Sequence, residues 1–221
     1  MWPSQQALES PFGVSVFGSA VLRTEPDFAL VELAVRRIAP SATSAFDATR
    51  KGVAAVRSSL QRSGVPDDAV EVSRVAIGSV FDGHGPSATF KGYQADVGFR
   101  IVLEPLDGLE GTLSDAVEAG ANVVHRVRYR TRRLRELREQ VRREAVGAAR
   151  RKAEIYCEAA GVRLGTVIHI EDVNPDQVNS RGGYGEGLIL SAGDEVEEGG
   201  LSSGSLEIAA AVLLGFQLLE D

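Results

Sequence analysis

The stretch NVVHRVRYRT (residues 122–131), followed closely by LRELREQVRREAVGAARRKAEIYCEAA (residues 134–160), decides the fold. The first run alternates with a period of two, as a strand does, and this period divides its side chains between two faces. Arg126, Arg128 and Arg130 fall on one face, and His125, Val127 and Tyr129 on the other. A strand is therefore predicted immediately before the second run.

The second run repeats its apolar residues every three or four positions, which predicts a helix over residues 134–160. The predicted buried stripe consists of Leu134, Leu137, Val141, Ala145, Ala149, Ala153, Tyr156 and Ala160. Gly161 follows as the residue expected to end the helix, because glycine adopts the left-handed conformation of a C-cap without steric cost.

The remaining segments extend this pairing of strands and helices in both directions. Strands are predicted over residues 14–21, 28–38, 70–81, 89–103, 164–173 and 206–219, and further helices over residues 41–63 and 105–120. The first two strands, separated by the polar turn at 23–27, are expected to form a hairpin, as are the third and fourth. The order β-β-α-β-β-α-β-α-β-loop-β predicts an α+β fold, with a mainly antiparallel sheet and helices packed on one face.

The organisation predicted from these segments is a single domain over residues 13–219, preceded by an N-terminal tail at residues 1–12. Residues 174–204 contain eight glycines and several acidic residues, which is typical of a long loop before the last strand.

The composition excludes several classes of protein. The chain has 221 residues and a single cysteine, so neither a disulfide scaffold nor a cysteine-ligated zinc site is expected. It has no run of 18 apolar residues that could form a membrane-spanning helix. Its net charge of -7 argues against nucleic acid as a partner. Residues 1–11 lack a signal-peptide pattern, which predicts a cytoplasmic protein, or a periplasmic or secreted one if the start was trimmed.

The charge is strongly divided along the chain. Residues 126–152 hold eleven arginines and one lysine against three glutamates, whereas residues 171–221 hold eleven acidic residues and one arginine. Arginine favours bidentate pairing with carboxylates, so the two regions are expected to pair within a chain or between copies. The predicted oligomer or anion-contact face consists of Arg126, Arg128, Arg130, Arg135, Arg138 and Arg142. Its predicted acidic counterpart consists of Asp194, Glu195, Glu197 and Glu198.

No catalytic, metal or cofactor site is predicted. The histidines, His84, His125 and His169, have no ligand spacing with a third acidic or thiol partner. Cys157 lies near the end of the predicted long helix, where the partial negative charge of the helix end disfavours a thiolate. A structural role for Cys157 is therefore favoured over a redox role.

Several segments, taken in order, resemble the SIMPL domain family over roughly residues 13 to 219. They include Val14-Ser15-Val16-Phe17-Gly18-Ser19-Ala20, Glu25-Pro26-Asp27, Gly92-Tyr93-Gln94-Ala95 and Ala159-Ala160-Gly161-Val162. The resemblance implies a family of largely unknown biochemical function. Its bacterial members are secreted or periplasmic immunogens associated with oxidative-stress defence, and some form ring- or channel-like homo-oligomers.

Two functions follow as expectations. The first is a non-enzymatic SIMPL-like protein that assembles with copies of itself into a large ring- or channel-like homo-oligomer in stress defence. The alternative is a binding module that uses the Arg-rich strand and helix at 126–152 for an anionic protein or nucleic-acid partner.

Overall fold

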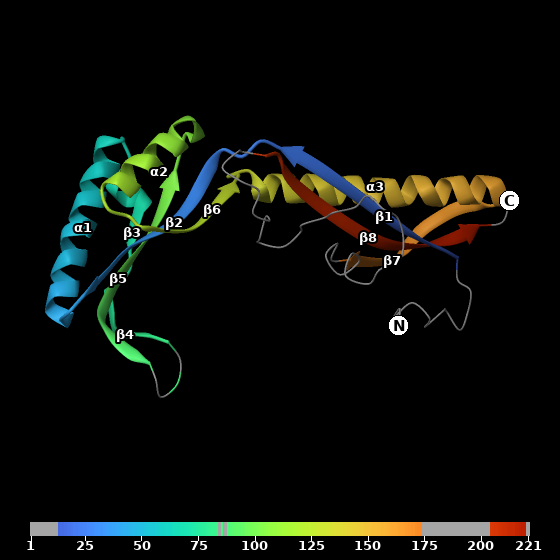
Figure 1. Cartoon of the computed structure of the whole chain (residues 1–221). Coiled ribbons are helices and arrows are strands. Elements are labelled where there is room, and N and C mark those ends of the chain that lie inside the picture. The colour runs from blue at the N-terminus through green and yellow to red at the C-terminus, as the bar shows by residue number, and fades with distance from the viewer. Residues whose placement is uncertain (1–12, 84, 86–87, 174–203, 220–221) are drawn as a thin grey trace. The chain divides into compact units, whose positions relative to one another are not determined.

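The computed structural model describes residues 13–83, 85, 88–173 and 204–219, and shows an α+β fold with antiparallel sheets, as predicted (Figure 1). The elements are β1 (Val14–Thr24), β2 (Phe28–Ala39), α1 (Ala42–Arg62), β3 (Val70–Val72), β4 (Ala76–Asp82), β5 (Thr89–Leu103), α2 (Leu109–Glu118), β6 (Val123–Arg130), α3 (Leu134–Ala160), β7 (Arg163–Val173) and β8 (Leu206–Leu219). The predicted tail at 1–12 and nearly all of the predicted loop at 174–204 lie outside the described residues.

The described elements divide into two compact units. Unit 1 contains β1, α3, β7 and β8, whose strands form a three-stranded sheet in the order β1-β8-β7. Unit 2 contains β2 to β6 with α1 and α2, and its sheet has the order β3-β5-β2-β6, with β4 also paired to β5. In each unit the helices pack on one face of the sheet.

The predicted hairpin between β1 and β2 is wrong. β1 pairs along its whole length with β8, from Val14 opposite Phe216 to Thr24 opposite Leu206, whereas β2 pairs with β5 and β6. The residues between the two strands include Pro26, which lacks a backbone N–H for a ladder, and the chain passes there from one unit to the other. The second predicted hairpin is confirmed, because β4 pairs antiparallel with β5.

The strand expected over residues 70–81 is divided into β3 and β4. Between them Ser73 bonds to Gly98 through both its backbone N–H, which donates to the Gly98 carbonyl at 2.8 Å, and its hydroxyl, which accepts from the Gly98 N–H at 2.9 Å. In a regular ladder the Gly98 N–H would donate to a backbone carbonyl. Here it donates to the Ser73 hydroxyl instead, so the ladder is interrupted at this point.

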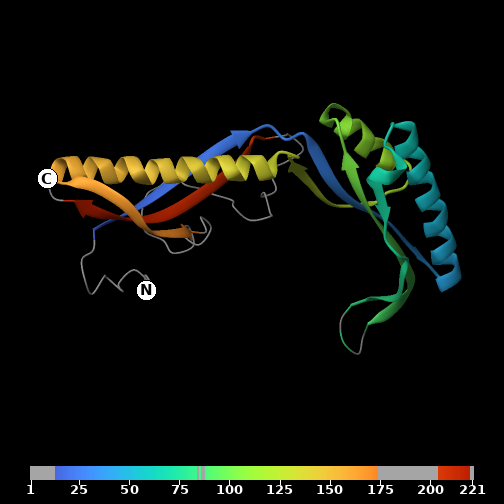
Figure 2. The same ribbon diagram turned by 180° about the vertical axis from the view of Figure 1, so that it is seen from behind.

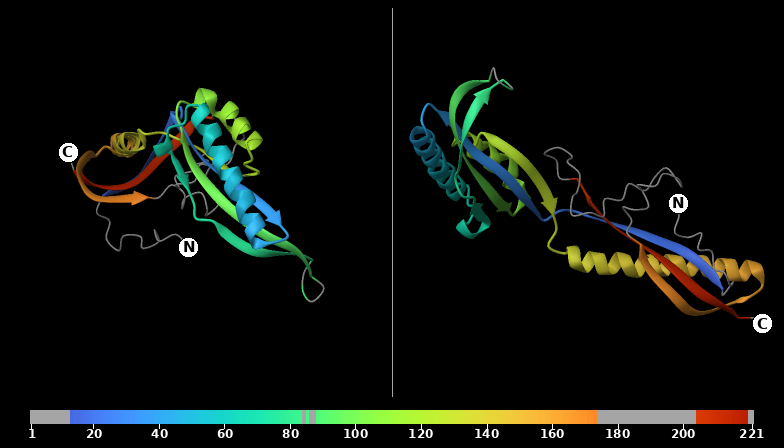
Figure 3. Two further views of the ribbon diagram at one scale, coloured as in Figure 1. Left: turned by 90° about the vertical axis from the view of Figure 1, so that its left-hand side faces the viewer. Right: turned by 90° about the horizontal axis from the view of Figure 1, so that it is seen from below.

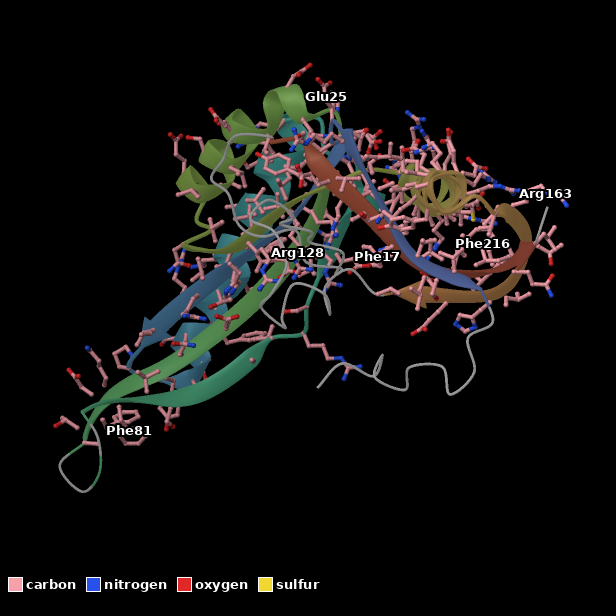
Figure 4. The ribbon with its side chains drawn as sticks, turned by 90° about the vertical axis from the view of Figure 1, so that its right-hand side faces the viewer. Phe17, Glu25, Phe81, Arg128, Arg163 and Phe216 are labelled. Atoms are coloured by element: carbon pink, nitrogen blue, oxygen red, sulfur yellow. The ribbon has the colours of Figure 1, made fainter. Side chains whose placement is uncertain are left out.

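The core of unit 1 lies between α3 and the strands β1 and β8 (Figure 2). Its helix side is a line of small and medium residues spaced by four: Leu137, Val141, Ala145, Ala149 and Ala153. β8 contributes alternate residues, of which Phe216 is fully buried on the side that faces α3 (Figure 4). The predicted stripe is correct except at its end, where Tyr156 is 55% exposed, Ala160 is also exposed, and Cys157 is buried instead.

The ends of α3 agree with the prediction at both bounds. Gly161 has φ 68° and ψ 33°, and the Val162 N–H donates to the Cys157 carbonyl at 3.0 Å. This six-to-one bond, beside a residue in the left-handed conformation, is a Schellman motif, which satisfies a carbonyl that the helix end leaves free.

Candidate functional site

The two faces of the five-stranded sheet differ sharply in chemistry. On β2, alternate residues from Ala29 to Val35 are buried and face α1 and α2; there the buried Thr49 of α1 donates from its hydroxyl to the Ala95 carbonyl at 3.3 Å. The opposite face, called the open face here, has no helix of unit 2 packed against it among the described residues (Figure 3). By strand register it carries Glu71, Phe28, Leu30, Glu32, Arg36, Asp96, Arg100, Val102, Arg126, Arg128 and Arg130.

The three arginines predicted to share one face of β6 do lie on the open face. Arg126, Arg128 and Arg130 are opposite Glu32, Leu30 and Phe28 of β2 and are half-buried. A bulge in β6, opposite Glu32 and Leu33 of β2, leaves His125 outside the register, so His125 does not alternate with the rest of the strand as predicted.

Alternating charges cross the open face from strand to strand. Arg100 of β5 donates to Glu71 of β3 at 3.2 Å, and its Nε lies 3.7 Å from Glu32 of β2. Glu32 is in turn 4.0 Å from Arg128 of β6. We call Glu71, Arg100, Glu32 and Arg128 the charge row. A second pair on this face, Arg36 with Asp96, is hydrogen-bonded at 2.7 Å.

Arg128 is the member of the charge row with an unusual environment. Its side chain is 27% exposed, and its Nε is buried with no hydrogen-bond partner among the described residues. Register places Arg128 beside Leu30, which in turn faces Val102, so the stem of the arginine lies along the apolar end of the open face. A buried donor that lacks an acceptor costs about 1–3 kcal/mol. The placement of the Arg128 side chain is therefore better explained by packing or by a binding role than by simple solvation of its charge.

The three candidate arginines of α3 belong to unit 1. Arg135 lies 3.5 Å from Glu139 of the same helix, and Arg142 lies 3.8 Å from Asp172 of β7. Arg138 also takes part in an interaction, as do Arg126 and Arg130 of β6. Each of the six candidate arginines therefore has at least one interaction. The three on β6 belong to unit 2 and the three on α3 to unit 1. The predicted acidic counterpart, Asp194, Glu195, Glu197 and Glu198, lies outside the described residues.

Sequence reasoning missed a cluster where β2 begins and β6 ends. The Asp27 carboxylate accepts hydrogen bonds from the Thr131 hydroxyl at 3.0 Å and from the Arg132 backbone N–H at 3.0 Å. The Arg132 guanidinium bonds to Glu104 and lies 5.1 Å from the centre of the Phe28 ring, and its bond to Glu104 raises the pKa of Arg132. The proline before Asp27 indicates a turn in the sequence, but only the pairing of β2 with β6 identifies the residues that Asp27 contacts.

The sheet edges of unit 1 are unequal. On the β1 edge, the Lys152 ammonium of α3 donates to the Phe17 carbonyl at 2.6 Å and lies 6.0 Å from the Phe17 ring. On the other edge, β7 pairs with β8 alone within the described ranges, and it exposes Ile168 and Ile170 by 44% and 66%. An exposed apolar edge strand is a template for pairing with another chain.

Other candidate chemistry is limited in the described part of the chain. Cys157 is 4% exposed and belongs to the packed side of α3, a position that suits a structural cysteine. No group of three or more histidine, cysteine or acidic side chains that could hold a metal occurs among the described residues. None of the described helices combines the length and hydropathy needed to cross a membrane.

Comparison with known proteins identifies relatives that match about three quarters of the chain. Two 26 kDa periplasmic immunogenic proteins, from Brucella melitensis biotype 1 and Brucella abortus strain S19, are each 23% identical over 174 residues, covering 76% of this chain and 70% of the relatives. Their names correct the expected cytoplasmic location, which rested only on the absence of a signal-peptide pattern in residues 1–11.

The family model that matches is SIMPL, described as a protein of unknown function (DUF541), and it covers residues 14–216. The match extends from β1 to β8 and therefore includes both units. The resemblance read from the sequence is confirmed, and the chain belongs to the SIMPL family.

Proposed function

We propose that the chain is a non-enzymatic periplasmic protein that assembles with copies of itself into a large ring- or channel-like homo-oligomer. The observation that carries the proposal is the exposed edge of β7, where Val167, Ile168 and Ile170 are 41–66% exposed on a strand that pairs with β8 alone in the described part of the chain. Exposed apolar residues on an edge strand mark interaction sites, and closed oligomers bury such residues between copies.

The division of charge supports the same proposal. The basic segment at 126–152 and the acidic residues after 171 are on one chain, so neighbouring copies can bring opposite charges together. Contacts of this kind are screened by salt, and assembly is therefore expected to weaken as the ionic strength rises.

Light scattering coupled to size-exclusion chromatography tests the proposal. The wild-type chain is expected to have several times the monomer mass of 23.5 kDa at every accessible concentration. Ile170→Lys places a charge on the β7 edge and is expected to lower the mass. Ile155→Lys is the matched control, because Ile155 lies on α3 of the same unit and is 64% exposed. A monomeric wild-type protein contradicts the proposal.

The alternative, an anion-binding module at 126–152, has less support. Arg135 and Arg142 already pair with Glu139 and Asp172, and the exposed carboxylates would compete with a polyanion. A gel-shift assay at low salt tests it: saturable binding of RNA or DNA that weakens steeply with salt would favour the alternative.

The stress-defence role implied by the resemblance forms part of the proposal. A strain that lacks the protein is expected to survive peroxide poorly and to recover with the wild-type gene but not with Ile170→Lys. If both genes restored survival equally, the stress-defence role would not depend on assembly.

A further inference from the structure

The hairpin of β4 and β5 extends beyond the end of α1 and presents a free strand edge (Figures 1 and 3). β4 pairs only with β5 among the described residues, and six of its seven residues are exposed. Apart from a few contacts with α1, β4 depends on β5 for its contacts within the described part of unit 2.

One face of the hairpin is apolar and aromatic. Phe81 lies opposite Phe90, with their ring centres 5.6 Å apart, and Phe90 is 5.3 Å from Tyr93, both in edge-to-face geometry. Phe81, which is labelled in Figure 4, is 56% exposed. Phe90 and Ile77 are each 48% exposed. Ile77, Ser79 and Phe81 alternate along β4, so their side chains share this face.

Two other sheet edges, those of β1 and β6, carry protection that β4 lacks. The β1 edge has Lys152 bonded to a carbonyl, and the β6 edge carries three arginines. Lysine, arginine and proline on an edge discourage the addition of another strand. From Ala76 to Phe81, β4 has no charged residue and no proline. Its edge is open to an added strand.

The sequence of β4 is complementary to itself. We infer that β4 pairs antiparallel with β4 of a second copy, about a two-fold axis at Ser79. In this register Ile77 lies opposite the second copy's Phe81, and Gly78 lies opposite its Val80. A side chain at Gly78 would meet nothing within 4 Å, so there is room beside the valine. Asp82, the one charged residue of β4, lies opposite Ala76 rather than a like charge.

The pairing gives a four-stranded ribbon in which the aromatic faces of two hairpins become continuous. Cross-strand pairs of aromatic and β-branched side chains stabilise such ribbons, and strand addition supplies backbone hydrogen bonds along the full edge. The self-complementary register selects a second copy as the occupant over an unrelated peptide. The inference rests on the proposed self-assembly and assigns one of its contacts.

Disulfide trapping tests the register. In a Cys157→Ala background, Ser79→Cys is expected to give a covalent dimer when oxidised by copper phenanthroline in air. Directly opposed residues in an antiparallel pair have Cα atoms about 4.5–5.5 Å apart, within the range that a disulfide spans. Asp82→Cys is the control, because the two copies of residue 82 would be about 20 Å apart.

The outcomes separate this inference from the proposed assembly. An oligomeric protein in which Ser79→Cys gives no more dimer than Asp82→Cys overturns the β4 contact and leaves self-assembly standing. A protein that is monomeric throughout overturns both. Val80→Lys provides a second measurement without a cysteine, and it is expected to reduce the mass of the assembly by half or more. Binding of a monomer to phosphatidylcholine vesicles, lost in Phe81→Ser, would identify a lipid surface as the occupant instead.

Discussion

Replacement of Gly18 by alanine tests the close packing of β1 against α3. A Cβ atom built at Gly18 lies 2.3 Å from the Ala145 carbonyl oxygen and 2.6 Å from the Ala149 Cβ. Non-bonded heavy atoms are optimally separated by about 3.5–4.0 Å, so strand and helix would have to separate by about 1 Å. β1 is held on its inner side by β8, and α3 by the buried residues along the same line.

Two effects of opposite sign decide the result. A glycine-to-alanine change reduces the entropy of the unfolded chain, which stabilises the protein by about 0.4–1 kcal/mol. Overpacking costs about 1–3 kcal/mol and is expected to dominate. We expect a net loss of about 1–2 kcal/mol, or roughly 2–8 °C in melting temperature at about 2–4 °C per kcal/mol for a chain of this size.

Thermal unfolding followed by circular dichroism measures this loss, and Gly147→Ala is the matched control. Gly147 lies within α3, where, of the described residues, an added Cβ would meet only the flexible end of Arg151 at 3.2 Å. Alanine in a helix interior is favoured over glycine by about 0.5–1 kcal/mol, so the control is expected to raise the melting temperature. If Gly18→Ala is as stable as the wild-type protein, the described contact between β1 and α3 is wrong.

Three further changes address unit 2 and the start of α3. Asp27→Ala removes the carboxylate that accepts from one hydroxyl and one backbone N–H, and it is expected to destabilise the protein by about 1–3 kcal/mol in urea unfolding. An unchanged midpoint of the urea transition would contradict the described cluster. Thr49→Val keeps the shape of a buried side chain but loses its hydrogen bond, with an expected loss of about 0.5–1.5 kcal/mol in the same assay, and a more stable variant would refute that bond. Hydrogen bonds from Arg133 lower the pKa of Glu136, so this pair stabilises the folded chain above the ordinary glutamate pKa and ceases to do so as the pH falls through the lowered value. In a carbon-13 NMR titration, Arg133→Gln should return the pKa of Glu136 toward its ordinary value.

Local patterns predicted the elements well because their causes are local. The bounds of α3 follow from an apolar repeat and from Gly161, which alone of the nearby residues adopts a left-handed conformation easily. The pairing of β1 was missed because alternation identifies a strand but not its partner. β8, the true partner, is separated from β1 by about 180 residues, and no turn signal connects them.

The candidate site was predicted only in part for the same reason. Period-two alternation places Arg126, Arg128 and Arg130 on one face, as the structure has them. Their neighbours Glu32 and Arg100 come from other strands, and the bulge in β6 alters the register in a way that composition does not indicate.

The pairing of β1 with β8 has a consequence for the order in which the chain can fold during synthesis. All the helices and strands of unit 2 lie in the segment Pro26–Arg132 and can form as soon as residue 132 has left the ribosome. β1 is made first but has its partner only when residues 206–219 emerge. At a synthesis rate of about 5–20 residues per second, β1 waits roughly 10–40 s. α3 is complete at residue 160, and for about 3–12 s more at the same rate its apolar side lacks β8. Unit 1 is therefore the part of the nascent chain that most needs protection from aggregation.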